Sequence, residues 1–325
     1  RDQGAARAEE ELARVELVAV PTETVYWLAA DSLVVAAVAR IFRAKGRPAN
    51  DPLIVHIHSL RQLESLAITN PSVTKVARAF WPGPLTLVLP KKDCVPELVT
   101  SGLPSVAVRM PSHPLFRTLL RTCDLPLAAP SANLFGYVSP TTAQHVRDGL
   151  AQRISHILDG GPCAIGVEST ILDLRNPAHP AILRPGAIER EALECVLGVP
   201  VKPAEHKKPA GPGAALAPGM LSRHYSPRTP IALYDTLPQP PSTAKDKTEA
   251  FVYFRRPAWA KGPAAKNIFW FSRQGDLREA AKTLFALLRQ LDQAGYAHIH
   301  AERAPGDEAL ALAVNDRLGR AAAKR

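Results

Sequence analysis

The stretch ELVAVPTETVY, residues 16–26, joins an apolar run of strand length to a polar loop that begins at a proline. Apolar runs of this kind alternate with amphipathic stretches of helical period through the first 198 residues. Further strands are expected at 52–57, 85–90, 105–110 and 156–160, and helices at 32–46, 59–67, 71–81, 113–123 and 141–151. Because strands and helices do not alternate strictly, the pattern predicts an α/β domain with a mixed sheet and helices packed against it.

The chain changes character after residue 198. Residues 199–220 are rich in proline, alanine, glycine and lysine and have no apolar period, which is typical of a linker. Beyond them, IALYD, AFVYFR and NIFWFS predict strands, and amphipathic stretches at 276–295 and 307–325 predict helices. We therefore expect three parts, a larger domain, a linker and a smaller Rossmann-like α/β domain, over residues 1–198, 199–228 and 229–325.

Composition narrows the class of protein. A length of 325 residues suits two domains, and 46% hydrophobic with 22% charged residues is usual for a soluble globular protein. No apolar run approaches the roughly 18–20 residues that span a bilayer, and the first residues have no signal or transit character, so we expect a cytoplasmic protein without membrane contact. The four cysteines are widely spaced with no CxxC pair, so a structural zinc site is not expected. The net charge of +10 favours anionic partners.

Polar segments stand where several of the expected elements end. They combine cations with hydroxyls and flexible backbone, in PTETVY (21–26), AKGRPANDPL (44–53), APSAN (129–133), GGPCAIGVEST (160–170) and ILRPG (182–186). Each alone has an ordinary explanation as a cap or a turn. Together, guanidinium and ammonium groups with hydroxyls and free N–H groups are what a triphosphate or a carboxylate requires. Since the chain has no Walker A, GxSxG or HExxH motif, an unfamiliar nucleotide site is expected.

The ordered motifs resemble a known family. PTETVY, AKGRP followed by PLIVH, FWPGPLTLVL, SVAVRMPSHP, PLAAPSANLFGYVSPTTAQHV, ILDGGPCAIGVESTILDL and ILRPGAI are similar to the YrdC-like domain of threonylcarbamoyl-AMP synthases. APGMLSRHYSP and AVNDRL resemble the long form of that family, which adds a C-terminal domain. So many motifs in one order are a far more specific signal than any single short pattern.

The resemblance implies an activity and a shape. It implies a twisted domain with a concave basic face that joins L-threonine, bicarbonate and ATP into threonylcarbamoyl-AMP and releases pyrophosphate. The product would pass to a complex that makes the t6A modification of tRNA, a weak contact with tRNA itself being left open. Mg²⁺ would accompany ATP, and the resemblance implies no zinc, flavin or nicotinamide.

The resemblance also implies roles for individual residues. Threonine would be bound by Thr24, His56, Arg109, Ala129 and Ser169. ATP would be bound by Lys45, Arg47, Asp51, Ser105, Ser131, Asn133, Ser139, Arg184, His224 and Tyr225, with Lys45 and Arg47 stabilising charge on the phosphates during catalysis.

One departure from the family pattern affects the site. The family usually has glycine after VY, where this chain has Trp27 in VYWLAAD, and an indole there either narrows the pocket beside Thr24 or points outward. Three other functions stay open. They are an RNA-binding module, which the basic charge favours and the 6% of aromatic residues disfavours; a carbamoyltransferase using carbamoyl phosphate; and a regulator that binds nucleotide or RNA without turnover.

Overall fold

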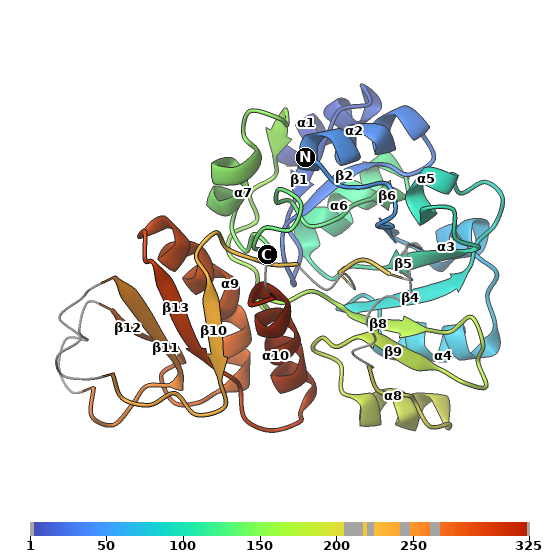
Figure 1. The fold of residues 1–325 in the computed structure, drawn as a ribbon. Coiled ribbons are helices and arrows are strands. Elements are labelled where there is room, and N and C mark those ends of the chain that lie inside the picture. The colour runs from blue at the N-terminus through green and yellow to red at the C-terminus, as the bar shows by residue number, and fades with distance from the viewer. Residues whose placement is uncertain (1–2, 205–216, 220–223, 241–247, 261–266, 324–325) are drawn as a thin grey trace.

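The computed structural model describes residues 3–204, 217–219, 224–240, 248–260 and 267–323. Within them the chain forms two sheets, each with its own helices (Figure 1). The expectations of a mixed sheet and of a smaller α/β unit are confirmed, and the sheet of the smaller unit is parallel. Of the expected linker, only 199–204, 217–219 and 224–228 are described, and these contain no helix or named strand.

The first sheet has nine strands among the described residues, in the order β7-β1-β2-β6-β3-β5-β4-β8-β9. Their bounds are β1 (Val18–Val20), β2 (Trp27–Asp31), β3 (Ile54–His56), β4 (Leu85–Pro90), β5 (Ser105–Arg109), β6 (Leu127–Ala128), β7 (His156–Ile157), β8 (Thr170–Asp173) and β9 (Ala181–Arg184). The pairs β1/β7, β3/β5 and β4/β8 are parallel and the other pairs are antiparallel, so the sheet is mixed.

The helices of this unit cover both faces of the sheet. They are α1 (Gln3–Ala13), α2 (Val35–Lys45), α3 (Leu60–Leu66), α4 (Pro71–Phe80), α5 (Glu97–Thr100), α6 (Pro114–Cys123), α7 (Ala143–Leu150) and α8 (Arg190–Leu197). Side chains of α1 and α6 pack on one face, and those of α2, α3, α4, α5, α7 and α8 pack on the other. The alternation of side chains along β5 decides which residues face which layer, with Ala107 on the first face and Val106 and Val108 on the second.

The second sheet is entirely parallel, in the order β10-β13-β11-β12. Its elements are β10 (Ile231–Tyr234), β11 (Glu249–Arg255), β12 (Ile268–Ser272), β13 (His298–Glu302), α9 (Leu277–Gln293) and α10 (Ala309–Ala321). Both helices pack on one face, where they share a single apolar cluster with α1, α6 and the inner face of the first sheet. The two units therefore meet through a continuous core and not through the linker alone.

The sequence did not predict every element. The helix α1 was not expected because RDQGAARAEEELAR mixes acids with bases, yet its buried residues Ala5, Ala8 and Leu12 form an apolar stripe at helical spacing. The strand β2 was not expected either, because its Ala-rich sequence has low β-propensity. Burial between β1 and β6 stabilises β2 despite this propensity.

The close approach of α9 to the first unit gives a test of this packing. Gly166 has φ of 88°, and a Cβ built on it would lie 2.5 Å from the backbone oxygen of Ala281 in α9. Gly295 has φ of 76° and no heavy atom within 4 Å of the same position. We expect Gly295→Ala to cost about 1–2 kcal/mol through its backbone conformation alone. Gly166→Ala should cost about 1–3 kcal/mol more, because α9 must shift.

Urea unfolding of both variants measures this difference. Equal losses of stability would show that α9 does not press against Gly166.

Candidate functional site

The buried guanidinium of Arg109 is the centre of one group of polar side chains. Arg109 ends β5 and is fully buried; it donates hydrogen bonds from Nη1 to Thr24 Oγ1 (3.0 Å), from Nη2 to Glu23 Oε1 (2.6 Å) and from Nε to the Gly83 carbonyl (3.3 Å). Burial raises the pKa of the Glu23 carboxyl, but the charge and hydrogen bond of Arg109 outweigh it, so this pKa lies below its usual value. Glu23 is therefore a carboxylate, and it fixes the guanidinium.

The β-register brings the other members of this group beside Arg109. His56 lies opposite Arg109 on β3, and Thr86 lies opposite it on β4, so all three project from the same face of the sheet. Thr86 Oγ1 is 2.8 Å from Ser169 Oγ, which brings Ser169 into the group. Ala129 donates its N–H to the Ile54 carbonyl and follows β6 on the same side. The five residues expected to bind threonine are thus gathered at neighbouring strands.

Trp27 points into this group. The indole is 1% exposed, and its Nε1 donates to Thr22 Oγ1 (3.1 Å) and more weakly to Thr24 Oγ1 (3.4 Å). Its ring lies edge-on to His56, with centroids 5.0 Å apart, and the Arg109 guanidinium carbon is 5.6 Å from its centre. Of the two orientations that the sequence left open, the structure shows the inward one.

His56 is buried without a well-aligned hydrogen-bond partner among the described residues. Neither ring nitrogen has one, and the ring lies between Trp27 and Phe116, whose centroid is 5.5 Å away. Burial, and secondarily the charge of Arg109, hold the pKa of His56 well below its usual value. His56 is therefore a neutral imidazole with unused donor and acceptor capacity.

A second group surrounds the end of α2. Gly46, with φ of 62°, ends the helix in the left-handed conformation and turns Lys45 and Arg47 inward. Lys45 Nζ donates to the carbonyls of Ser131 (2.5 Å) and Asn133. Burial first, and then the charge of Arg47, hold the pKa of Lys45 well below its usual value.

Arg47 and Asp51 form a buried ion pair in this second group, with Nη2 and Oδ2 2.8 Å apart. Burial raises the pKa of Asp51 against the effect of the Arg47 and Lys45 charges. Its carboxylate oxygens make no well-aligned hydrogen bond with the described residues. Ser105 begins β5, where it is buried and lies opposite Pro90 on β4.

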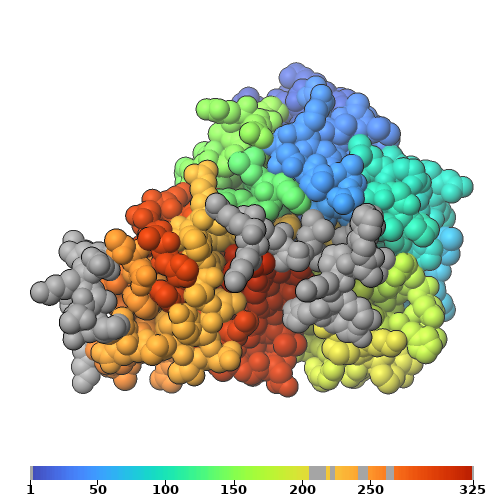
Figure 2. All heavy atoms as spheres, in the orientation of Figure 1, coloured from blue at the N-terminus to red at the C-terminus, as the bar shows by residue number. Residues whose placement is uncertain are grey.

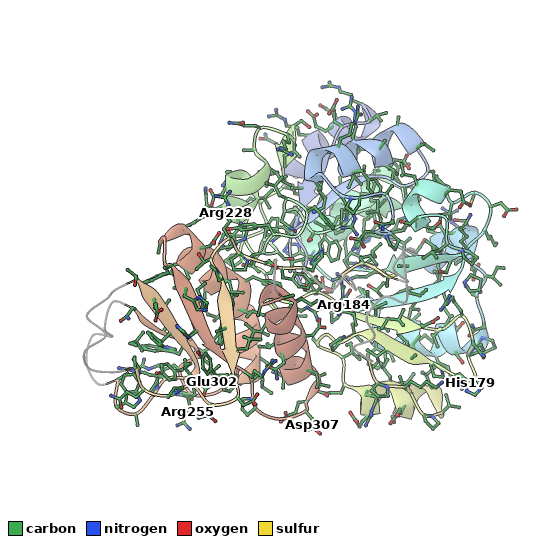
Figure 3. The ribbon with its side chains drawn as sticks, in the orientation of Figure 1. His179, Arg184, Arg228, Arg255, Glu302 and Asp307 are labelled. Atoms are coloured by element: carbon green, nitrogen blue, oxygen red, sulfur yellow. The ribbon has the colours of Figure 1, made fainter. Side chains whose placement is uncertain are left out.

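Arg184 and the described part of the linker pack beside the two groups. Arg184, labelled in Figure 3, ends β9 and donates to the Ser169 carbonyl and Oγ (3.1 Å each) and to the Pro218 carbonyl (3.1 Å). His224 and Tyr225 are both buried, with ring centroids 4.1 Å apart. Tyr225 has φ of 60°, an uncommon conformation for a residue with a side chain.

One small cavity touches both groups, through Trp27 next to the first and through Arg47 and Ser131 in the second. It is lined by Trp27, Arg47, Pro130, Ser131, Glu168, Arg184, Pro218, Gly219, His224 and Tyr225, and its volume is about 10 Å³. That is roughly the space of one water molecule. An amino acid or a nucleotide can enter only if the linker residues, Trp27 or both move.

Sequence reasoning missed three residues that the structure connects to the site. Glu23 fixes Arg109, and Glu168 lies at the cavity, where its Oε1 accepts from Ser139 Oγ (2.6 Å). Arg317, from the second unit, pairs with Glu168 at 3.0 Å. The charges inside PTETVY and GVEST were visible signals for the first two. For Arg317 the only signal was the AVNDRL motif, which does not reveal its partner.

Comparisons with known proteins agree with these two units. A family model for Sua5, YciO and YrdC, described as "Telomere recombination", matches residues 10–186. A second, described as "Threonylcarbamoyl-AMP synthase, C-terminal domain", matches residues 188–323. Two similar proteins are called threonylcarbamoyl-AMP synthase. The one from Pyrococcus abyssi is 43% identical over 95% of this chain and 91% of its own length, and the one from Bacillus subtilis is 40% identical over 95% and 90%.

The crystal structure of P. abyssi Sua5 complexed with L-threonine is similar to the whole fold. It matches with a TM-score of 0.86 and 40% identity, over 98% of this chain and 94% of that one. The arrangement of both units is therefore shared with a protein that binds threonine.

The buried neutral state of His56 predicts a pH dependence of stability. Below pH 6.5 the unfolded chain binds a proton at this residue and the folded chain does not, so the free energy of unfolding falls as the pH is lowered. Between pH 7.5 and 5.5 this costs about 1.4 kcal/mol. We expect His56→Asn to lose that part of the slope, measured by urea unfolding at both pH values.

Phe116→Leu, at the neighbouring ring, is the control. It should lower stability equally at both pH values. A slope that is the same in His56→Asn and the parent chain would contradict the buried neutral imidazole.

Proposed function

This chain belongs to the Sua5/YciO/YrdC family, in the form that carries the Sua5 C-terminal domain, and we propose that it is a threonylcarbamoyl-AMP synthase. It would join L-threonine, bicarbonate and ATP into threonylcarbamoyl-AMP and release pyrophosphate. The observation that carries the proposal is that the two groups lie on either side of one cavity, which Trp27 lines next to the first group and Arg47 lines in the second. The Arg109 group suits an amino acid, and the Lys45 and Arg47 group suits phosphates.

The Arg109 group offers what threonine requires. A guanidinium has five N–H groups, and the described partners of Arg109 take three of them, which leaves two for a carboxylate. The imidazole of His56, which lacks well-aligned partners among the described residues, and the hydroxyls of Thr24 and Ser169 can pair with the amine and the side-chain hydroxyl. Such a polar pocket selects a hydroxylated amino acid, because an analogue without the hydroxyl leaves buried groups unpaired.

The Lys45 and Arg47 group can hold the triphosphate. Lys45 is bound to carbonyls and Arg47 to one carboxylate, so the group keeps positive charge that phosphates can neutralise. Mg²⁺ would arrive as part of the ATP complex, where it screens the phosphate charges. The buried Asp51 carboxylate fits a role next to it, since its oxygens lack well-aligned donors among the described residues.

The chemistry would then depend on position. The threonine amine gives a carbamate, either by adding to CO2 with loss of a proton or by condensing with bicarbonate with loss of water. A carbamate oxygen attacks the α-phosphorus in line, the bond from that phosphorus to the bridging oxygen breaks, and pyrophosphate leaves with the electron pair. Lys45 and Arg47 stabilise the negative charge that shifts to the leaving group, and no covalent enzyme intermediate is required.

The wider setting of the reaction is also proposed. The product is a reactive adenylate, so it would pass to a t6A-forming transferase complex that acts on tRNA.

Among the described residues, no helix has both the length and the apolar character to cross a bilayer.

The proposed activity has a direct test. With Mg²⁺, bicarbonate and ATP, the purified chain should release pyrophosphate and form the adenylate only when L-threonine is present, followed by HPLC. Arg109→Ala and Lys45→Ala should each lower kcat/KM by about 100-fold or more, because each removes a buried charge from the transition state.

His58→Ala, at a pair with Asp124 outside the cavity, is the matched control and should keep full activity. Folded protein that binds ATP but releases no pyrophosphate with threonine would contradict the proposal and favour a regulator without turnover.

The inward indole makes a prediction specific to this chain. Because Trp27 fills space beside Thr24 and Arg109, it must be displaced when threonine binds. We expect Trp27→Gly to lower the KM for threonine about tenfold, equivalent to about 1.4 kcal/mol. The KM for ATP should change less, and Trp27→Phe, which keeps a large ring, should resemble the parent chain.

Steady-state kinetics with each substrate varied measures both constants, and thermal unfolding checks that the variants are folded. A higher KM for threonine in Trp27→Gly would show that the indole supports the amino acid instead of obstructing it.

A further inference from the structure

Arg317 crosses from the second unit into the first. It lies on α10 and is fully buried, and its guanidinium donates from Nε to Glu168 Oε2 (3.0 Å) and from Nη1 to the Pro185 carbonyl (2.7 Å). Figure 1 shows α10 between the second sheet and the strands β8 and β9, and its surface lies between the two units in Figure 2. An arginine of the C-terminal unit thus binds the segments that precede β8 and follow β9.

The Glu168 carboxylate binds one residue from each unit. One carboxylate oxygen accepts from Arg317, and the other accepts from Ser139 Oγ at 2.6 Å. The side chain is 2% exposed and lines the cavity that Arg47 and Arg184 also line. Its neighbour Ser169 accepts from Arg184 through both its carbonyl and its hydroxyl. The position of the Glu168 carboxylate therefore sets where the Ser139 hydroxyl lies.

Charge keeps this connection in place. Burial lowers the pKa of Arg317, but Tyr225, Glu168 and Asp316 outweigh it, so the guanidinium stays ionised, with its carbon 5.6 Å from the Tyr225 ring centre. Asp316 Oδ2 lies 3.1 Å from Nη1 and gives the arginine a second carboxylate. If Arg317 were removed, Glu168 would remain buried without its main cationic partner, which is costly inside a protein.

We propose that Arg317 is a positioning residue of the nucleotide site: it fixes the Glu168 carboxylate, which in turn holds the Ser139 hydroxyl toward ATP. The C-terminal unit then completes a site whose other described residues come from the first unit and the linker. This inference rests on the proposed synthase function, in which Ser139 and Arg184 bind ATP.

The test uses Arg317→Met, Arg317→Lys and Glu168→Gln in the full chain. Arg317→Met should lower kcat/KM for ATP at least tenfold, with a smaller change in KM for threonine. Arg317→Lys should recover part of the loss, because an ammonium can reach Glu168 but cannot also bond the Pro185 carbonyl.

The double variant Arg317→Met with Glu168→Gln separates positioning from stability. A neutral amide no longer leaves a buried charge unpaired, so the double variant should unfold at a higher temperature than Arg317→Met alone. Its kcat/KM for ATP should nevertheless stay low, because the carboxylate that orients Ser139 is gone. Recovery of activity together with stability would overturn the proposal, since Arg317 would then be only structural.

Asp292→Asn is the matched control. Asp292 joins the units elsewhere, where it accepts from Tyr137 Oη (2.8 Å) and Thr229 Oγ1 (3.0 Å). Asp292→Asn should leave kcat/KM for ATP within about twofold of the parent chain. A loss equal to that of Arg317→Met would overturn the proposal, because any weakening of the interface would then be enough to lower activity.

Nucleotide affinity, measured by calorimetry with a non-hydrolysable ATP analogue, distinguishes failure of this inference from failure of the function. Weaker binding in Arg317→Met would support the positioning role even if no threonine-dependent turnover occurred. Unchanged binding, or no binding by the parent chain, would overturn it.

Discussion

The site is organised by the need to bury cations. Among the described lysines and arginines, six are at most 7% exposed: Lys45, Arg47, Arg109, Arg184, Arg289 and Arg317. Buried charge is tolerated only when it is paired or hydrogen-bonded. Carboxylates at Glu23, Asp51 and Glu168 serve three of these cations, whereas Lys45, Arg184 and Arg289 are bound largely by backbone carbonyls.

Carbonyl oxygens satisfy hydrogen bonds but supply no net negative charge. The described carboxylates near the cavity therefore do not neutralise all of the positive charge there. The remaining positive charge favours the binding of a polyanion. The same requirement explains the shape of the surrounding loops. The segments at Ser131–Asn133 and Val138–Ser139 run past the buried cations and direct their carbonyls inward. The fold therefore uses irregular backbone where the chemistry requires it, and regular strands and helices elsewhere.

Much of the fold could be predicted because many of its strands and helices have a strongly periodic pattern of apolar residues. The longer strands β4 and β5 and the helices α2, α4, α6 and α9 follow their patterns, since these segments have one clear buried face. The strand β2 and the helix α1 are stabilised by contacts with β6 and α6, about 100 residues further along the chain. A local sequence pattern does not show such contacts. The position of His56 opposite Arg109 likewise follows from the register of two strands that are about 50 residues apart.

The site could be predicted as a set of residues but not as a geometry. The resemblance of the motifs indicated Thr24, Arg47 and Arg109, and the structure places Arg47 at the cavity and the other two behind Trp27, without testing their roles. The direction of Trp27 depends on the space left between Thr22, Thr24 and His56, which no sequence pattern measures. The partnership of Glu168 with Arg317 joins residues 149 positions apart, on different units.

That separation has a consequence for how the protein is made. Nascent chains grow at about 5–20 residues per second, so roughly 7 to 30 seconds pass between the synthesis of Glu168 and that of Arg317. During this interval the first unit can form its own sheet, but the Glu168 carboxylate has no cation from α10 to bind. Until α10 has been made, water must hydrate the Glu168 carboxylate, and Arg317 neutralises its charge when α10 docks.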